Sequence, residues 1–204
     1  MKDTSGHLVI ISSPSGGGKN SVINALMTRF LNSARLVTTT TRPMRPLEKD
    51  GIDYVFVTHE EFEQKLQAGD FLEHNKYAAG HYYGTDRKTL EHLLDSHPLV
   101  FSQIEVNGKH QLDREGVSHL AIFLLPESLE ILKERIEKRG GLTPEVIEER
   151  LQIAKTELEA SKDYDYRIVN KEGYIDVTVE EIKQILASVL KVEPIPLDKK
   201  GIIG

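Results

Sequence analysis

Short apolar runs alternate with amphipathic stretches along this chain of 204 residues. The apolar runs favour β-branched residues, and they predict strands at Leu8–Ile11, Leu36–Thr38, Tyr54–Val57, Leu99–Gln103, Leu120–Leu125 and Arg167–Val169. Apolar positions at helical spacing predict helices over residues 19–31, 59–68, 86–95, 128–139, 144–161 and 179–191. Strands and helices that alternate in this way build a parallel sheet flanked by helices. The pattern therefore predicts an α/β fold.

Three of the expected helices carry start signals. The spacing of a capping box, in which a Thr and a Glu satisfy backbone N–H groups at the helix end, occurs at Thr58/Glu61 and at Thr178/Glu181. Thr143 precedes Pro144, which suits a cap followed by a proline in the first turn. These signals predict helices that begin directly after Thr58, Thr143 and Thr178.

The alternation of strands and helices is interrupted between residues 41 and 85 by a polar loop, one helix and a turn-rich segment. We interpret this stretch as a lobe inserted into a core of residues 1–40, 86–139 and 162–191. Gly140 and Gly141 separate two charged helices and predict a hinge for a lid over residues 140–161. Residues 192–204, with two prolines and two glycines, are expected to form a tail. The chain is then one domain, residues 1–204.

Composition narrows the classes of function. Apolar residues make up 39% of the chain and charged residues 28%, which are ordinary globular values. There is no cysteine, so disulfides, thiolate zinc sites, iron–sulfur clusters and cysteine nucleophiles are excluded. The net charge of −6 disfavours a protein that coats nucleic acid, and the longest apolar run, Leu120–Leu125, is far below the ~20 residues of a membrane helix. We expect a cytoplasmic protein with no nucleic-acid and no membrane partner.

A strand, a glycine-rich loop and a helix follow one another near the start of the chain. Consecutive backbone N–H groups of such a loop, together with the helix dipole, point at one anion, and glycines let the backbone approach a phosphate closely. The side chain of Lys19 would reach the outer phosphates. The sequence predicts a phosphate-binding loop (P-loop) formed by Ser13, Pro14, Ser15, Gly16, Gly17, Gly18, Lys19, Asn20 and Ser21.

The loop departs from the strict pattern G-x-x-x-x-G-K-S/T at both ends. Ser13 stands at the first position and Asn20 at the last. The departure at Asn20 is the more serious one, because a hydroxyl after the lysine normally ligates Mg²⁺, and an amide oxygen is all that Asn20 can offer. Asn20 is therefore a poor candidate for a metal ligand.

Two further segments have the spacing of GTPase motifs but lack the required context. The segment at residues 113–116 fits D-x-x-G, yet it follows a helical stretch rather than the end of a strand. The segment at residues 170–173 begins like N-K-x-D but has Gly173 where a carboxylate would have to bind guanine. Both observations speak against a GTPase.

A second phosphate site is indicated at Thr40-Thr41-Arg42-Pro43-Met44-Arg45, where two guanidinium groups three residues apart can fork a single phosphate. The order of P-loop, T-T-R-x-x-R, G-x-D-Y-x-F at residues 51–56, F-L-E at 71–73 and Y-Y-G-T at 82–85 resembles the guanylate kinase family. The resemblance extends over roughly residues 8–190. It implies a P-loop kinase that moves the γ-phosphoryl group of ATP, with Mg²⁺, to GMP.

The resemblance also implies roles for individual residues. In this family the residues that bind GMP match Thr38, Arg42, Arg45, Tyr54, Glu73, Tyr83, Thr85 and Glu105. Glu73 matches the carboxylate that accepts from the guanine N1–H and amino group, which adenine lacks. The residues that bind ATP match the P-loop and Asn170, close to the adenine. The catalytic cations match Lys19, Arg42 and the lid arginines Arg135, Arg139 and Arg150.

One departure leaves an alternative open. Where many members of the family carry an acid after the fourth expected strand, this chain has Gln103, and Glu105 follows two residues later. Asn20 and Gln103 thus place neutral amides at both positions that would hold the metal. A guanylate-kinase-like module that binds nucleotides without turnover is therefore the alternative to an active enzyme.

Overall fold

The computed structural model describes residues 6–46, 48–76, 80–138 and 140–194. Five parallel strands form the central sheet in the order β2-β7-β1-β8-β9. These strands are β1 (His7–Ser12), β2 (Ser33–Leu36), β7 (Leu99–Ser102), β8 (Leu120–Leu125) and β9 (Tyr166–Val169). The prediction of an α/β fold with a parallel-sheet core is confirmed.

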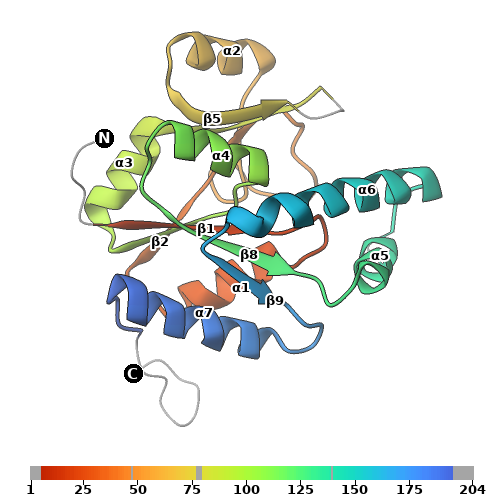
Figure 1. Ribbon diagram of the computed structural model, residues 1–204. Coiled ribbons are helices and arrows are strands. Elements are labelled where there is room, and N and C mark those ends of the chain that lie inside the picture. Colours follow the sequence, from red (N-terminus) through yellow and green to blue (C-terminus); the bar gives the residue numbers. More distant parts are fainter. Residues whose placement is uncertain (1–5, 47, 77–79, 139, 195–204) are drawn as a thin grey trace.

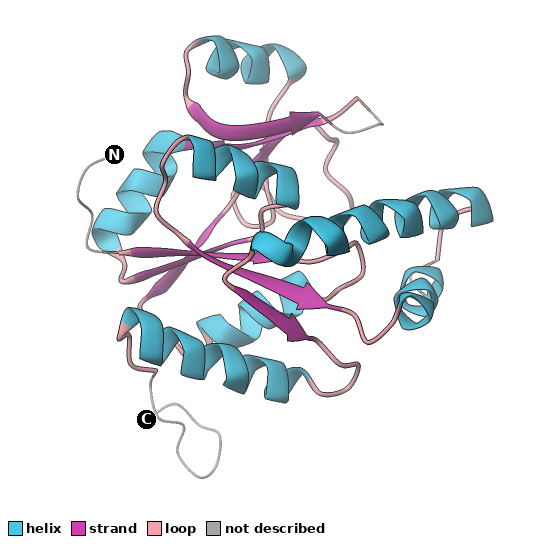
Figure 2. Cartoon of the chain, in the orientation of Figure 1, coloured by secondary structure: helices cyan, strands magenta, loops and turns pink. Residues whose placement is uncertain are grey.

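Helices cover both faces of this sheet (Figures 1 and 2). On one face lie α1 (Lys19–Met27) and α7 (Ile175–Leu190), and on the other lie α3 (Arg87–Ser96) and α4 (Val106–Arg114). Alternate residues of β1 serve the two faces, because successive strand side chains point to opposite sides. Val9 and Ile11 belong to the core beneath α1 and α7, whereas Leu8 and Ile10 belong to the core beneath α3 and α4.

A smaller sheet occupies the region that we expected to be an inserted lobe. Its order is β4-β3-β6-β5, with β3 (Thr39–Thr40), β4 (Val55–Phe56), β5 (Phe71–Lys76) and β6 (Tyr82–Asp86). The helix α2 (His59–Gln67) covers it (Figure 1). The ring of Phe62 stacks on Phe71, with 4.4 Å between centroids, and on Tyr82, with 5.2 Å. Aromatic packing therefore joins α2 to its sheet.

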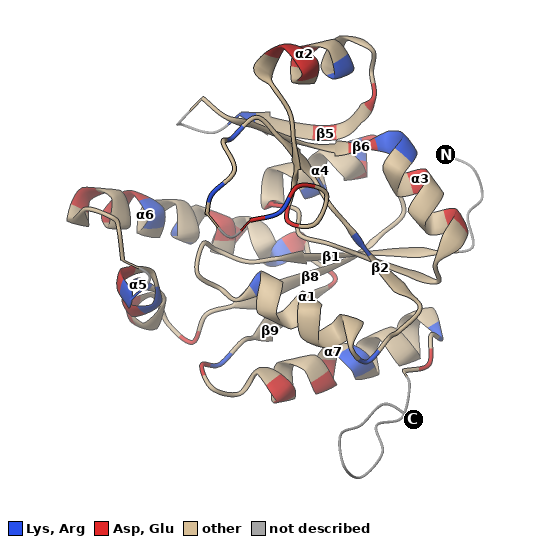
Figure 3. Cartoon of the chain, turned by 180° about the vertical axis from the view of Figure 1, so that it is seen from behind, with Lys and Arg blue, Asp and Glu red and all other residues tan. Residues whose placement is uncertain are grey.

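A pair of helices with its own apolar contacts follows β8. In α5 (Leu129–Lys138) and α6 (Pro144–Ala160), Leu132 and Ile136 pack against Ile147 and Leu151. This cluster is separate from the cores beneath α1 and α7 and beneath α3 and α4, while the end of α6 packs against a further cluster that includes Phe123 of β8. Charged residues of both signs lie along the two helices (Figure 3). The expected hinge at Gly140 and Gly141 joins them, and both glycines have positive φ angles of 70° and 75°. The division into core, lobe and lid stays an interpretation.

Two of the three helix starts are confirmed. Both bonds of the Thr58/Glu61 capping box are present, and Thr143 with Pro144 begins α6. The third is wrong, because α7 begins at Ile175 and Thr178 lies inside it.

Other boundaries also differ from the prediction. The expected strand at residues 36–38 lies at Ser33–Leu36 instead, and α1 ends at Met27 rather than at residue 31. The strands β5 and β6 and the helix α4 were not among the expected elements. Of the expected tail, residues 195–204 lie outside the described part of the chain. In that described part, no helix combines the length and apolarity needed to cross a membrane.

Candidate active site

The carboxyl ends of the parallel strands bring distant segments of the chain to one edge of the sheet. The P-loop follows β1, Gln103 and Glu105 follow β7, and Asn170 follows β9. Ligands of open α/β sheets bind in the crevice at this edge. The P-loop therefore lies at the edge of the sheet where a ligand is expected.

The P-loop has a backbone that glycine allows and other residues resist. Gly16 and Gly18 have φ angles of 95° and 90°, in the left-handed region. A Cβ atom on Gly17 would lie 2.4 Å from Ser13 Oγ, so a side chain there would clash. The Nζ atom of Lys19 donates to the Ser13 carbonyl over 2.7 Å. The lysine ammonium is thus held over the loop, at the position where outer phosphates would bind.

Asn170 is part of the support of this loop. Its Nδ2 donates to the Gly17 carbonyl over 2.8 Å, and its Oδ1 accepts from the Thr178 hydroxyl over 3.0 Å. The residue is 7% exposed. The structure therefore gives its amide a definite task, to hold the P-loop, in addition to the expected place near the adenine.

Three hollows run side by side across the molecule. A cleft of about 350 Å³ lies between the two sheets, a pocket of about 160 Å³ lies at the P-loop, and a shallow groove of about 330 Å³ lies beyond it. The cleft and the P-loop pocket share Ser15, Lys19 and Gln103. The pocket and the groove share Gly16, Gly18 and Ser21. The three hollows therefore adjoin one another in a row, called the path below, with Lys19 at the junction between the cleft and the P-loop pocket.

Arg42 follows β3 of the small sheet, and several neighbouring groups hold its guanidinium in place. Its Nε donates to the Tyr83 hydroxyl over 3.1 Å, and its Nη2 donates to both oxygens of Glu48 over 2.8 and 3.0 Å. The guanidinium carbon also lies 5.3 Å from the centroid of the Tyr54 ring. Tyr54 and Tyr83 line the cleft, whereas Arg42 does not line it and lies behind these two phenol groups, in contact with both.

The backbone N–H of Arg45 donates to Glu48 Oε2 over 2.8 Å, and the Arg45 side chain is exposed. Glu48 therefore connects Arg42 and Arg45, which the sequence predicted to act as a pair. The hydrogen bond from Arg42 is the main cause that lowers the pKa of Glu48, with smaller effects from the Arg45 backbone and from both arginine charges. The carboxylate stays ionised and acts as an anionic partner of this pair.

Glu73, on β5 next to the β6 strand that carries Tyr83, also lines the cleft and is buried, with 5% of its surface exposed. Its Oε1 accepts from the Thr85 hydroxyl over 2.6 Å, and its Oε2 accepts from the Asn75 amide over 3.3 Å. A Cβ atom on Gly108 would lie 2.6 Å from Oε2, so α4 can approach the carboxyl only with a glycine there.

The environment of Glu73 changes its titration. Burial raises the pKa of Glu73 to about 7, and the charge of Glu105 adds to the rise, against the hydrogen bonds from Thr85 and Asn75. Thr38, 7% exposed, lines the same cleft. The Glu73 carboxyl can therefore ionise and accept hydrogen bonds from a ligand edge that carries two donors.

The helix α6 presents one face to the cleft. Arg150, Ile153 and Glu157, which lie one and two helical turns apart, line it together. Arg150 Nη1 donates to the Ser15 hydroxyl of the P-loop over 3.2 Å. Burial raises the pKa of Glu157 to about 7, assisted by Glu105 and opposed by Lys19. Sequence reasoning found Arg150 but missed Glu157, although the i, i+7 spacing from Arg150 could have indicated it.

Arg135 takes a different position, in the shallow groove. Its guanidinium bonds to Glu127, to Glu172 and to the Asn170 carbonyl, each over 3.2 Å. It lies next to the P-loop but does not line the cleft. Arg139 falls outside the described residues.

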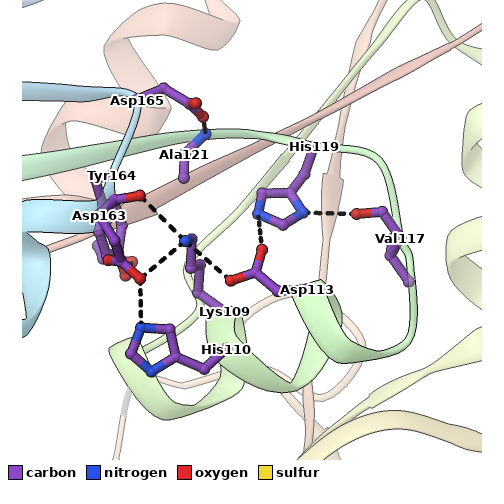
Figure 4. Close-up of polar contacts among 10 residues, drawn as sticks. Lys109, His110, Asp113, Val117, His119, Ala121, Asp163, Tyr164 and Asp165 are labelled. Carbon is purple, nitrogen blue, oxygen red and sulfur yellow. Dashed lines mark hydrogen bonds and ion pairs between the residues drawn. The ribbon is translucent and has the colours of Figure 1, made fainter.

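The base of α6 is anchored by a polar network on α4 (Figure 4). The buried ammonium of Lys109 pairs with Asp113 over 3.0 Å and with Asp163, in the 3₁₀ helix Ser161–Asp163, over 3.3 Å. His110 also contacts Asp163, over 2.8 Å. This network ties the end of α6 to the helix that follows Glu105.

Hydrogen bonds through two hydroxyl groups connect this network to the residue before the P-loop. The hydroxyl of Tyr164, the residue after the 3₁₀ helix, donates to Ser12 Oγ over 2.8 Å. Ser12 Oγ in turn donates to the carbonyl of Ile104. Ser12, the residue before the P-loop, therefore connects two other parts of the site. These are the turn that holds Gln103 and Glu105, and the base of α6.

Comparison with known proteins places the chain in one family by its sequence. The family model described as guanylate kinase matches residues 5–189. A guanylate kinase of Hahella chejuensis is 40% identical over 180 residues, which cover 88% of this chain and 85% of the relative. One of Clostridium perfringens is 38% identical over 185 residues, which cover 91% and 84%. Among solved structures, the guanylate kinase of Anaplasma phagocytophilum matches with a TM-score of 0.73, 30% identity and 99% of each chain covered.

Proposed function

The chain belongs to the guanylate kinase family, and we propose that it uses the path from the groove to the cleft to transfer the γ-phosphoryl group of ATP to GMP. The observation that carries this proposal is the junction at Ser15, Lys19 and Gln103, which line both the P-loop pocket and the cleft that contains Glu73. The products are ADP and GDP. An oxygen of the GMP phosphate forms a bond to the γ-phosphorus, and the bond from that phosphorus to the β,γ-bridging oxygen breaks.

GMP binds in the cleft in this proposal. Glu73, in its ionised form, accepts from the guanine N1–H and amino group, and Thr38, Thr85 and Glu105 complete the polar surroundings of the base and ribose. Arg42, Arg45, Tyr54 and Tyr83 bind the GMP phosphate. Glu48 forms an ion pair with the Arg42 guanidinium, so phosphate binding requires Arg42 to share or change that contact.

ATP binds along the P-loop, with its adenine in the groove beside Asn170 and Arg135. The backbone of residues 13–18, Ser21 and the Lys19 ammonium surround the β- and γ-phosphates. Arg150, already in contact with Ser15, and Arg135 supply positive charge as negative charge develops on the transferred group. Arg139 is assigned to the same task from the sequence alone.

The use of ATP implies a divalent metal, and we propose that it is Mg²⁺, which enters with the triphosphate. The donors at the P-loop do not fit a metal held by the protein, because Asn20 and Gln103 are neutral amides and Asn20 Oδ1 is already occupied by a guanidinium. Among the described residues, no group of three or more His, Asp and Glu side chains is placed to hold a metal ion. A cytoplasmic location also stays a prediction.

Separate calorimetric titrations of GMP and of ATP test the division into two half-sites. We expect Glu73→Gln to weaken GMP binding, by up to ~10⁴-fold, because a donor amide then faces guanine donors, and to leave ATP binding within about threefold of wild type. We expect the reverse for Lys19→Met. ATP binding lost in Glu73→Gln while GMP binding persists would contradict the assignment.

A further inference from the structure

Asn20 has a partner that the P-loop pattern does not explain. The Nη2 group of Arg35, on β2, donates to Asn20 Oδ1 over 3.0 Å, and the Nη1 group donates to Asn24 Oδ1 over 3.1 Å. The two asparagines lie one turn apart at the start of α1, so the planar guanidinium bridges them. Arg35 thereby reaches the P-loop from a neighbouring strand.

This contact fixes which side of the Asn20 amide is available for a ligand. An amide group has an acceptor oxygen and a donor NH₂, and the guanidinium, which has donors only, selects the oxygen. The NH₂ group then remains as a donor. Asn20 lines the P-loop pocket together with Lys19 and Gln103, so that donor belongs to a pocket built for phosphate oxygens.

The same contact disfavours a metal ion at Asn20. A cation bound to Oδ1 would lie against the guanidinium of Arg35, and two positive charges a few ångströms apart repel each other. Of the residues that line the P-loop pocket in the described part of the chain, none is Asp or Glu. Positive charge at this place is supplied by Lys19 and Arg35 instead.

From these contacts we infer that Asn20 is a phosphate-binding donor positioned by Arg35, and that the chain binds the ATP triphosphate without a metal held by the protein. The inference rests on the proposed function, because it concerns the donor half of that site. Arg35 is a positioning residue, and its charge replaces part of what a protein-held cation would supply. The desolvation that lowers the pKa of Arg35 is opposed by the nearby Tyr54 and Asp53.

Thermodynamic linkage makes the inference measurable as a ratio, the dissociation constant of ATP in EDTA divided by that in saturating MgCl₂. If Mg²⁺ gains no ligand from the protein, no protein–metal bond favours the Mg²⁺ complex of ATP over free ATP, and by reciprocity the protein does not tighten the binding of Mg²⁺ to ATP. The dissociation constant of ATP measured in EDTA should then exceed the one in saturating MgCl₂ by no more than about threefold. The ratio is taken within one variant, so partial loss of folded protein cancels.

Variants at Asn20 and Arg35 should shift this ratio in a defined direction. Asn20→Ser restores a hydroxyl that can ligate Mg²⁺, and we expect it to favour the Mg²⁺ complex of ATP by about tenfold. Asn20→Asp, which repels free triphosphate and attracts Mg²⁺, should shift the ratio further in the same direction. Arg35→Met should weaken metal-free ATP by about tenfold, because it removes both the charge and the orientation of the amide.

Arg29→Met is the matched control, since it removes the same charge beyond the opposite end of α1, and its ratio should stay at the wild-type value. A wild-type protein that prefers the Mg²⁺ complex by a hundredfold or more would overturn the inference. An unchanged ratio in Asn20→Ser, Asn20→Asp and Arg35→Met would also overturn it, and would move the metal contact to another group such as Ser21. If ATP binds under neither condition, the proposed function fails, and this inference fails with it.

Discussion

At the scale of single residues, several polar side chains of the site are oriented by a hydrogen bond to a neighbouring side chain. Thr85 fixes the carboxyl of Glu73, Glu48 fixes the guanidinium of Arg42, and Arg35 fixes the amide of Asn20. Groups that are held in this way lose little rotational freedom when a ligand binds. Each pair therefore makes a separate prediction about affinity.

The carboxyl of Glu73 should lose a proton when GMP binds. Burial raises its pKa to about 7, and guanine donors would stabilise the ionised form. At pH 7 we expect release of roughly half a proton per GMP, and GMP affinity should fall as the pH drops from 8 to 6. Calorimetry in two buffers of different ionisation enthalpy measures the release. No proton release at pH 7 would be inconsistent with this role of Glu73.

Arg42→Lys should damage the use of GMP and spare ATP. A lysine ammonium is a point charge that cannot serve Tyr83, Glu48 and a phosphate in the geometry of the fork. We expect kcat/KM for GMP to fall by about 10²-fold, while the ATP dissociation constant stays within about threefold. Arg87→Lys, an exchange at an arginine on α3 outside the three hollows, is the control. Loss of ATP affinity with GMP affinity intact would mean that the two phosphate sites are reversed.

Glu157→Gln should stabilise the protein, but only at neutral and higher pH. The pKa of Glu157 is raised to about 7 in the folded state, above the ~4.3 of an unfolded glutamate. The folded protein therefore binds an extra proton between those values, and stability is lost as the pH rises through about 7. Removing the carboxylate should add about 1 kcal/mol to the free energy of unfolding at pH 8 and almost nothing at pH 4. Chemical denaturation at both pH values measures this, and equal effects would contradict it.

At the scale of elements, the sequence predicted strands and helices best where the hydrophobic pattern is regular or a capping motif marks the helix start. The strands β1 and β8 and the helices α2 and α6 have strong apolar periodicity or explicit caps, and they lie close to the expected ranges. The strand β5 was missed because its sequence, FLEHNK, contains the polar residues that build the cleft. In β5, residues needed at the site interrupt the hydrophobic pattern that would have predicted a strand.

The candidate site shows the same division. The P-loop and the pair Arg42 and Arg45 were predicted from local spacing, whereas Glu73 and Arg150 were expected from the family resemblance. Arg35 and the support given by Asn170 depend on contacts across 15 and 153 positions of the chain, to Asn20 and to Gly17. No local pattern carries such information, because the tertiary fold creates the pair.

The anchor of α6 makes a prediction about this element. Tyr164→Phe removes the hydrogen bond to Ser12, where the P-loop, the Ile104 turn and the base of α6 meet. We expect kcat to fall by about tenfold while KM for ATP changes little, because alignment rather than binding is disturbed. Tyr174→Phe, at a residue that is 54% exposed, is the matched control. Equal effects of both substitutions on kcat would remove the positioning role of Tyr164.

At the scale of the whole molecule, two sheets and a helical pair enclose one path. The central sheet supplies the P-loop and the turn after β7, the small sheet supplies Arg42 and Glu73, and α6 covers the junction between them (Figure 1). The reaction needs no covalent intermediate with the protein, since alignment of two phosphates and compensation of their charge lower the barrier. The central claim is therefore direct transfer between two nucleotides bound on one path.

Transfer of label from ATP to GMP tests this claim most directly. The protein is incubated with MgCl₂, GMP and ATP labelled in the γ-phosphate, and the nucleotides are separated. We predict that the label appears in GDP in the same amount as ADP is formed, that omission of GMP abolishes ADP formation, and that Lys19→Met binds GMP without transferring label. Label found only in inorganic phosphate, or no labelled GDP from a wild-type protein that binds both nucleotides, would contradict the account.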